Sequence, residues 1–291
     1  MSETFREGSS RSTDTRPLLD VRDLRVRFHL RTGTVEAVRG VSFSLGRERL
    51  GIVGESGSGK SQTGRAILGL TPPPGEVTAE RLAFDGQDLL RASKRSLREL
   101  RGGRITMVMQ DPKYSLNPVM TIGDQIIEAY RAHAKATRAE ARDKALAMLE
   151  AVQMRDPGRV FALYPHEVSG GMGQRAMIAM MLVTDPDLLI ADEPTSALDV
   201  TVQMEILRIL DDLVAERGMG LIFISHDLKL VSSFCNRVLV MYAGRVVEEV
   251  EAKHLREARH PYTQGLMRCL PTLAQDVHPL PTLKRDPAWG L

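Results

Sequence analysis

Hydrophobic and polar residues alternate in two segments near the start of the chain. Leu24, Val26 and Phe28 alternate with arginines, and the same period of two returns in residues 41–45. This period is typical of β-strands that bury one face. Residues 31–34 include a glycine and predict a turn between the two segments. We therefore expect an antiparallel β unit in this part of the chain.

Short apolar runs further along the chain predict additional strands. Residues 50–53 form one such run, and residues 188–191 and 221–224 form two more in which apolar residues follow one another without alternation. Continuous runs suit strands that are covered on both faces, as in a parallel sheet. Helical composition follows the first run over residues 62–70 and separates the other two over residues 202–217. This order of elements predicts an α/β fold.

The middle of the chain has the composition of helices. Residues 121–154 contain one glycine and no proline, and residues 172–183 predict another helix. The longest apolar run covers residues 176–183, which is far short of the roughly 20 residues that cross a bilayer. Residues 105–109 predict one more strand, and residues 237–250 predict a β ribbon.

Composition narrows the possible classes of protein. The chain has 291 residues with 39 Lys+Arg against 37 Asp+Glu, and this near balance gives no support to nucleic acid as a partner. Cys235 and Cys269 are the only cysteines, which excludes a disulfide scaffold and favours a reducing, cytoplasmic compartment. Residues 1–17 are polar and lack an apolar period, so we expect a disordered leader and no secretory signal there.

A glycine-rich stretch lies between the strand predicted at residues 50–53 and the helix predicted at residues 62–70. It satisfies the pattern G-x-x-x-x-G-K-[ST] of phosphate-binding loops. Glycines let backbone N–H groups approach phosphate oxygens, and the following helix adds the positive end of its dipole. The pattern predicts that Lys60 neutralises the β- and γ-phosphates of a nucleotide and that Ser61 binds Mg²⁺. A flexible linker is the alternative, and the flanking strand and helix disfavour it. The predicted nucleotide-binding residues are Gly54, Glu55, Ser56, Gly57, Ser58, Gly59, Lys60, Ser61 and Gln62.

Two adjacent carboxylates end the apolar run at residues 188–191. Burying Asp192 and Glu193 so close to an apolar strand costs several kcal/mol unless they are paired or bind a cation. We therefore predict that Asp192 belongs to the Mg²⁺ shell and that Glu193 orients or deprotonates the attacking water. A strand that ends in a solvated acidic turn is the alternative.

The order of further motifs resembles the ATP-binding subunits of ABC transporters. Residues 169–175, with the sequence SGGMGQR, look like the signature loop of that family. Gln110 matches its glutamine loop, residues 196–199 match the loop after the acidic pair, and His226 matches its switch histidine. Phe28 falls where the family keeps an aromatic residue that stacks on adenine.

This resemblance implies a P-loop NTPase (RecA-like) core with an antiparallel β subdomain and an inserted α-helical subdomain. It covers about residues 18–270. The implied organisation is a leader at 1–17, the first part of the ATP-binding core with the β subdomain at 18–110, the helical subdomain at 111–165, the second part of the core at 166–255 and a C-terminal extension at 256–291.

The resemblance also implies that the site is shared between two subunits. Ser169, Gly170 and Gly171 would open a helix and offer a hydroxyl, free N–H groups and a dipole end, which makes a second phosphate-binding device. The family pairs two ATPase subunits head to tail, so each ATP lies between one phosphate loop and the signature loop of the other subunit. Asp199 is implied in the nucleotide site as well.

The implied catalytic set contains Lys60, Glu193, His226 and Gln110. By this resemblance His226 holds the γ-phosphate and the water in line. Gln110 binds Mg²⁺, senses the nucleotide and relays its presence to the helical subdomain.

A closer resemblance concerns the class of solute. Residues 115–118, 164–167, 197–203 and 260–263 look like segments of the oligopeptide, dipeptide and nickel importer ATPases. The resemblance implies a motor subunit on the cytoplasmic face of the inner membrane, with a non-identical second ATPase, two membrane permeases and a solute-binding protein as partners. Nickel, opine or glutathione-like solutes remain alternatives to peptides, and an exporter ATPase or a soluble ABC ATPase are more distant ones.

Many relatives of this kind carry a C-terminal cysteine cluster that binds an iron–sulfur centre. Only Cys269 lies beyond Cys235 in this chain. We therefore predict ATP and Mg²⁺ as the ligands, and no iron–sulfur cluster.

Overall fold

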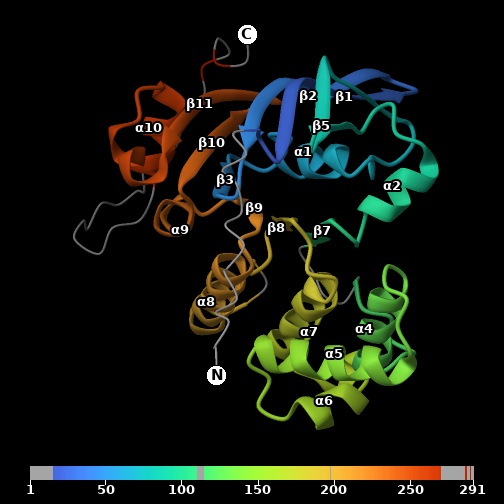
Figure 1. Cartoon of the computed structure of the whole chain (residues 1–291). Coiled ribbons are helices and arrows are strands. Elements are labelled where there is room, and N and C mark those ends of the chain that lie inside the picture. Colours follow the sequence, from blue (N-terminus) through green and yellow to red (C-terminus); the bar gives the residue numbers. More distant parts are fainter. Residues whose placement is uncertain (1–15, 110–114, 197, 270–285, 287–288, 290–291) are drawn as a thin grey trace, which may run out of the picture.

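Two β-sheets with helices around them make up the computed structural model, which describes residues 16–109, 115–196, 198–269, 286 and 289 (Figure 1). The larger sheet has six strands in the order β11-β10-β3-β9-β8-β7. Every neighbouring pair in it is parallel except β10 with β11, which is antiparallel. The strands are β3 (Arg49–Val53), β7 (Ile105–Val108), β8 (Leu188–Asp192), β9 (Gly220–Ser225), β10 (Arg237–Tyr242) and β11 (Arg245–Glu251).

The parallel sheet confirms the interpretation of the continuous apolar runs, because successive side chains of a strand enter different cores. In β8, Leu188 and Ile190 belong to the hydrophobic core shared with the second sheet and α1 (Lys60–Ile67). Leu189 and Ala191 belong to the core on the other face, beneath the helices. Both faces of the strand are therefore apolar, as a strand covered on both sides requires.

The second sheet is antiparallel and contains the alternating segments. Its order is β2-β1-β5-β6, and β4 also pairs with β1. Leu24 lies opposite Val41, and Val26 lies opposite Val38, so the predicted antiparallel pair is confirmed. Three of its strands are only two to four residues long, and the sequence pattern did not predict them. The strands are β1 (Leu19–Leu30), β2 (Gly33–Leu45), β4 (Gly75–Thr78), β5 (Arg81–Phe84) and β6 (Gln87–Asp88).

The remaining helices cover the parallel sheet or lie beside it. The predicted helix at residues 202–217 is α8 (Val200–Arg217). Figure 1 shows α9 and α10 beside β10 and β11, and α2 connecting the antiparallel sheet with β7. These helices are α2 (Lys94–Leu100), α9 (Leu228–Phe234) and α10 (Pro261–Arg268), and a 3₁₀ segment, η2 (Ala252–Glu257), precedes α10.

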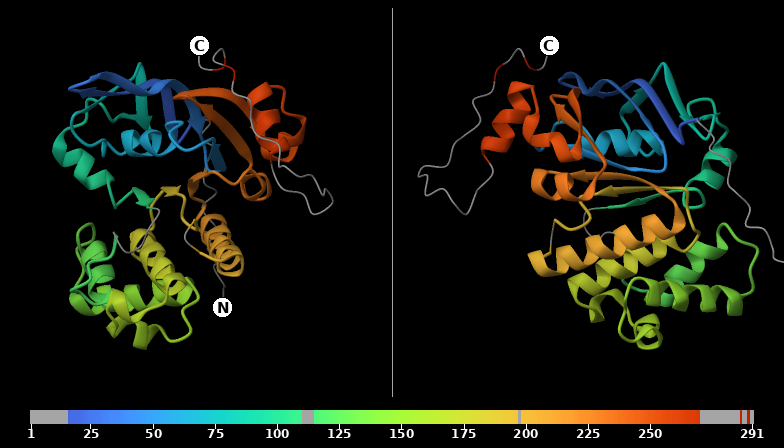
Figure 2. Two further views of the ribbon diagram at one scale, coloured as in Figure 1. Left: turned by 180° about the vertical axis from the view of Figure 1, so that it is seen from behind. Right: turned by 60° about the vertical axis from the view of Figure 1, so that its left-hand side comes forward.

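A separate group of helices lies below the parallel sheet (Figure 2). It contains α4 (Ile122–Arg131), α5 (Arg138–Ala151), α6 (Pro157–Ala162), the short η1 (Pro165–Glu167) and α7 (Gly170–Leu182). Helix α7 confirms the helix predicted at residues 172–183. Within the part of the chain that the structure describes, no helix combines the length and the apolar character needed to cross a bilayer.

The helical region expected at residues 121–154 consists of two helices, and the composition did not locate the break between them. Helix α4 ends at Arg131 and α5 begins at Arg138. The reason is a capping box, in which the Thr137 hydroxyl accepts a hydrogen bond from the Glu140 N–H at 3.3 Å and the Glu140 carboxylate accepts one from the Thr137 N–H at 2.7 Å. This pattern starts a new helix and outweighs the favourable composition of the connecting residues.

The capping box gives a direct test of this boundary. We expect Thr137→Ala to lower the free energy of unfolding by about 1 kcal/mol, because an N-terminal N–H of α5 loses its acceptor. Urea unfolding measures the change. Thr137→Ser keeps a hydroxyl and serves as the control, and an equal loss in both variants would contradict the assignment.

Candidate functional site

The phosphate-binding sequence forms the loop between β3 and α1, at the centre of the parallel sheet. Gly54 has φ 152° and Gly59 has φ 100°, which side chains rarely adopt. A Cβ at Gly54 would lie 2.2 Å from the Met241 carbonyl oxygen, and one at Gly59 would lie 2.4 Å from the Ala37 carbonyl oxygen. The loop is therefore held tightly against β10 and β2, and both positions require glycine.

The ammonium group of Lys60 lies inside the curve of this loop. Its Nζ donates hydrogen bonds to the carbonyl oxygens of Gly54 and Glu55, each at 2.9 Å. Burial lowers the pKa of Lys60, and the nearby charges of Glu193, Asp192 and Glu55 oppose that shift. The loop thus keeps a positive charge at the place where the motif predicts phosphate.

Asp192, at the end of β8, reaches the first turn of α1. Its carboxylate accepts a hydrogen bond of 2.8 Å from the Ser61 hydroxyl. Burial raises the pKa of Asp192, and the bond from Ser61 opposes the shift. A carboxylate and a hydroxyl oxygen are the kinds of ligand that Mg²⁺ takes together with phosphates and waters. The pair therefore fits the predicted metal, although no cluster of three or more His, Cys, Asp or Glu side chains occurs among the described residues.

Glu193 and His226 come together from neighbouring strands. Glu193 follows β8 and His226 follows β9, which is parallel to it, so the two strand ends lie at the same edge of the sheet. The Nδ1 of His226 lies 3.3 Å from a carboxylate oxygen of Glu193. Glu193 also has φ 47°, an unusual conformation for a residue other than glycine and one that clusters at functional sites.

A pocket of about 400 Å³ lies at the phosphate loop. Lys60 and Glu193 line it, and Phe28 on β1 lines it from the antiparallel sheet. A larger pocket of about 950 Å³ lies between α2 and α4, away from the loop, and contains none of the predicted site residues. We take the smaller pocket as the candidate site because the phosphate loop forms it. Its lining residues are Phe28, Ala37, Ser56, Gly57, Gly59, Lys60, Ser61, Gln62 and Glu193.

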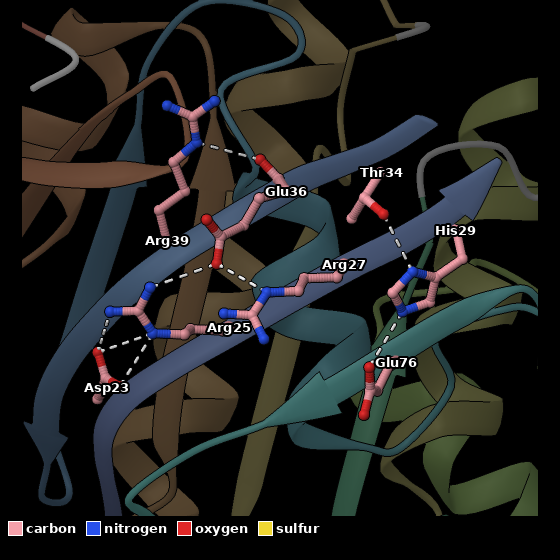
Figure 3. A network of polar contacts seen from close by, with 8 residues as sticks. All are labelled: Asp23, Arg25, Arg27, His29, Thr34, Glu36, Arg39 and Glu76. Carbon is pink, nitrogen blue, oxygen red and sulfur yellow. Dashed lines mark hydrogen bonds and ion pairs between the residues drawn. The ribbon is translucent and has the colours of Figure 1, made fainter. Parts of the chain in front are cut away.

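The position of Phe28 depends on its three strands. It lies opposite Val35 on β2 and Gly75 on β4, and a Cβ at Gly75 would come within 2.8 Å of the ring. The residues on either side of it in the chain, Arg27 and His29, belong to a network of polar contacts between the strands (Figure 3). His29 contacts the Thr34 hydroxyl at 3.2 Å and the Glu76 carboxylate at 3.1 Å, which ties all three strands together.

The predicted signature residues lie at a different place from the pocket. Ser169 caps α7 and accepts a hydrogen bond from the Met172 N–H at 3.3 Å, and Ser169 and Gly170 are exposed. Asp199 caps α8 in the same way through the Val202 N–H at 3.0 Å. None of these residues, nor Gly171, lines the pocket at the phosphate loop. Gln110 lies outside the described residues.

Close packing joins the signature helix to α8 and to the loop after β8. A Cβ at Gly171 would lie 2.8 Å from Val202 on α8. The buried amide of Gln174 donates a hydrogen bond to the Pro194 carbonyl oxygen. The first turns of α7 therefore pack directly against α8 and contact the loop that follows the acidic pair.

The sequence patterns gave no role to Tyr262, which contacts the phosphate loop. The Tyr262 hydroxyl on α10 accepts a hydrogen bond of 3.1 Å from the Glu55 N–H. The only signal was the His-Pro-Tyr-Thr segment at residues 260–263, to which no structural role was assigned.

A glycine-rich loop between a central parallel strand and a helix, with an acidic residue at the end of the next strand but one, whose carboxylate reaches the first turn of that helix, defines a P-loop nucleoside triphosphatase. The model of the ABC transporter family matches residues 38–196.

Curated proteins agree with this match. The probable peptide ABC transporter ATP-binding protein y4tR of Sinorhizobium fredii is 51% identical, covering 87% of this chain and 77% of its own. The dipeptide transport ATP-binding protein DppD of Haemophilus influenzae is 47% identical, over 92% of this chain and 82% of its own. The oligopeptide transport ATP-binding protein OppD of Escherichia coli is 45% identical, over 93% of this chain and 80% of its own length.

Solved structures show the same fold. A dimeric, post-hydrolysis structure of the ATP-binding cassette MJ0796 with ADP and Pi has a TM-score of 0.71 and 26% identity, covering 80% of this chain and 98% of its own. The cbiO1 protein of Clostridium perfringens, part of the cbiONQ complex, has a TM-score of 0.70 and 27% identity. The match covers 83% of this chain and 91% of the cbiO1 chain. The chain belongs to the ATP-binding subunits of ABC transporters and is an ATPase.

The buried carboxyl of Asp192 predicts a particular dependence of stability on pH. Because folding raises its pKa, the ionised form opposes folding at neutral pH, and this cost disappears as the pH falls through the raised pKa toward the ordinary value of 3.8. We expect Asp192→Asn to raise the free energy of unfolding at neutral pH without metal or nucleotide, and to raise it less as the pH falls. Urea unfolding across this range measures the effect. The exposed Asp212→Asn on α8 is the control, and a destabilised Asp192→Asn protein at neutral pH would contradict the account.

Proposed function

We propose that this protein is the ATP-hydrolysing motor subunit of an ABC importer for small solutes, and that these solutes are di- and oligopeptides rather than nickel, opine or glutathione-like cargo. The observation that carries the hydrolytic part is the contact of 3.3 Å between Glu193 and His226 beside the phosphate-loop pocket. The peptide class is supported by the similar proteins, which carry the names of peptide, dipeptide and oligopeptide transport ATP-binding proteins.

In the proposed reaction ATP is the substrate, and its triphosphate follows the loop from Gly54 to Ser61. Lys60 turns its ammonium group from the loop carbonyls to the β- and γ-phosphates. Backbone N–H groups at the start of α1 bind the remaining phosphate oxygens. Phe28 stacks on the adenine at the opposite side of the pocket.

Glu193 and His226 act on the attacking water in this proposal. The carboxylate of Glu193 orients the water or accepts its proton, and His226 binds the γ-phosphate and keeps the water in line with it. Ser61 and Asp192 would hold Mg²⁺, which supplies positive charge to the phosphates when it is bound. Gln110 completes this set as the residue that senses the nucleotide.

A second ATPase subunit is part of the proposal, because the exposed caps of α7 and α8 lie outside the chain's own pocket. Ser169, Gly170, Gly171 and Asp199 would face the nucleotide of that partner in a head-to-tail dimer, as ATP-binding cassettes can be dimeric. The proposed assembly adds two membrane permeases and an extracytoplasmic solute-binding protein, with this chain on the cytoplasmic face of the membrane. Nucleic acid and an iron–sulfur cluster are not part of it.

The role of Lys60 is tested by nucleotide binding. We expect Lys60→Ala to weaken the binding of ATP roughly 10- to 100-fold, because charge-assisted hydrogen bonds to phosphate are lost. Calorimetric titration of the full chain measures the affinity. The exposed Lys135→Ala is the matched control, and wild-type affinity in Lys60→Ala would refute the assignment of the loop.

The role of Glu193 is tested by separating binding from hydrolysis. We expect Glu193→Gln to bind ATP with nearly unchanged affinity while its turnover falls on the order of 10²- to 10⁴-fold, because the variant cannot accept the proton of the water. Phosphate release by the assembled transporter measures turnover. Wild-type turnover in this variant would remove Glu193 from the reaction.

The solute class requires transport by the complete system. The complex that copurifies with this chain is reconstituted with its solute-binding protein, and uptake of a labelled dipeptide is compared with uptake of Ni²⁺. We expect ATP-dependent uptake of the peptide that is lost with Glu193→Gln. Uptake of Ni²⁺ alone would overturn the peptide class.

A further inference from the structure

A buried tyrosine of the C-terminal helix contacts the backbone of the phosphate loop. Tyr262 is fully buried, and its hydroxyl accepts the hydrogen bond of 3.1 Å from the Glu55 N–H. The two residues are 207 positions apart in the chain. A fixed hydroxyl from outside the motif therefore reaches the glycine-rich segment that has to keep its shape around a triphosphate.

The peptide unit between Gly54 and Glu55 is held at both of its polar ends. Its N–H donates to Tyr262, and its carbonyl oxygen accepts from the ammonium group of Lys60 at 2.9 Å. Since the peptide unit is planar, these two bonds together determine its orientation. Gly54 itself gives little resistance to rotation, because glycine tolerates many backbone conformations.

In the proposed reaction, triphosphate binding changes one of these two bonds. When Lys60 turns to the phosphates, the Gly54 carbonyl loses its ammonium partner. The bond from Glu55 to Tyr262 does not involve Lys60, so it still holds the peptide unit in place. We therefore expect this peptide unit to keep the orientation that the structure shows.

The start of helix α10 is anchored to β11 of the parallel sheet. The Glu248 carboxylate on β11 accepts hydrogen bonds from the N–H groups of Arg259, at 2.6 Å, and His260, at 3.3 Å, directly before the helix. The Tyr262 ring also packs against the Tyr242 ring at the end of β10, with 4.6 Å between their centroids, and against Trp289 at 5.8 Å. The tyrosine hydroxyl is thus fixed relative to the sheet that carries the loop.

We propose that Tyr262 is a positioning residue for triphosphate binding, which it supports by holding the peptide unit between Gly54 and Glu55 in the orientation that the bound nucleotide requires. This inference rests on the proposed nucleotide site. It gives the C-terminal segment a role in the binding of ATP, in addition to any contact with partners.

The test removes only the hydroxyl group of Tyr262. We expect Tyr262→Phe to bind a non-hydrolysable ATP analogue with Mg²⁺ roughly 2- to 10-fold more weakly than the wild type, as the loss of one hydrogen bond predicts. Calorimetric titration of the full chain measures the affinity. In the assembled transporter we expect the KM for ATP to rise by a similar factor while kcat stays within about twofold, because the catalytic groups are unchanged once the nucleotide is bound.

Tyr242→Phe is the matched control. It removes a hydroxyl from the same aromatic cluster, and among the described residues Tyr242 makes no hydrogen bond to the phosphate loop. We expect this variant to bind the analogue like the wild type. Thermal unfolding of both variants shows that each retains its fold.

Two results would overturn the inference. One is wild-type affinity in Tyr262→Phe, and the other is an equal loss of affinity in both tyrosine variants, which would assign the effect to packing. Failure of the proposed function gives a different result, since the wild-type chain itself would then not bind the analogue.

Discussion

The buried ammonium group of Lys60 is the interaction on which the site depends. A charge taken out of water has to be compensated, and here two loop carbonyls compensate it at 2.9 Å each. This arrangement is possible only because the glycine-rich loop curves around the side chain. The loop can curve because Gly54 and Gly59 adopt conformations in which a Cβ would collide with neighbouring backbone. The charge, the loop and the sheet behind it therefore form one unit.

The parallel sheet adds the other charged groups to this unit. Strands β8 and β9 are neighbours and end at the same edge, so the residues that follow them meet. Asp192 reaches Ser61, and Glu193 reaches His226, although each pair is distant in the sequence. The negative charges of the acidic pair also act on Lys60 and partly offset the effect of its burial on its pKa. The positions of the candidate catalytic groups thus follow from sheet topology.

Local sequence patterns predicted the elements whose structure is determined by residues close together in the chain. Alternation predicted the pair of β1 and β2, continuous apolar runs predicted the parallel strands, and the glycine spacing predicted the loop around Lys60. The contact of Tyr262 with Glu55 left no comparable signal, because it joins segments that only the completed fold brings together. The break between α4 and α5 was missed for another reason, since a capping pattern at Thr137 competes with helical composition on both sides. The subdomain boundaries and the roles of Gln110 and Ser169 stay predictions.

A structure of the full chain with Mg²⁺ and a non-hydrolysable ATP analogue tests the central claim most directly. The account predicts that the Lys60 ammonium group leaves the carbonyl oxygens of Gly54 and Glu55 and lies within hydrogen-bond distance of the β- and γ-phosphates. It predicts as well that the Glu55 N–H stays on the Tyr262 hydroxyl. A nucleotide bound elsewhere, with Lys60 still on the loop carbonyls, would contradict the account.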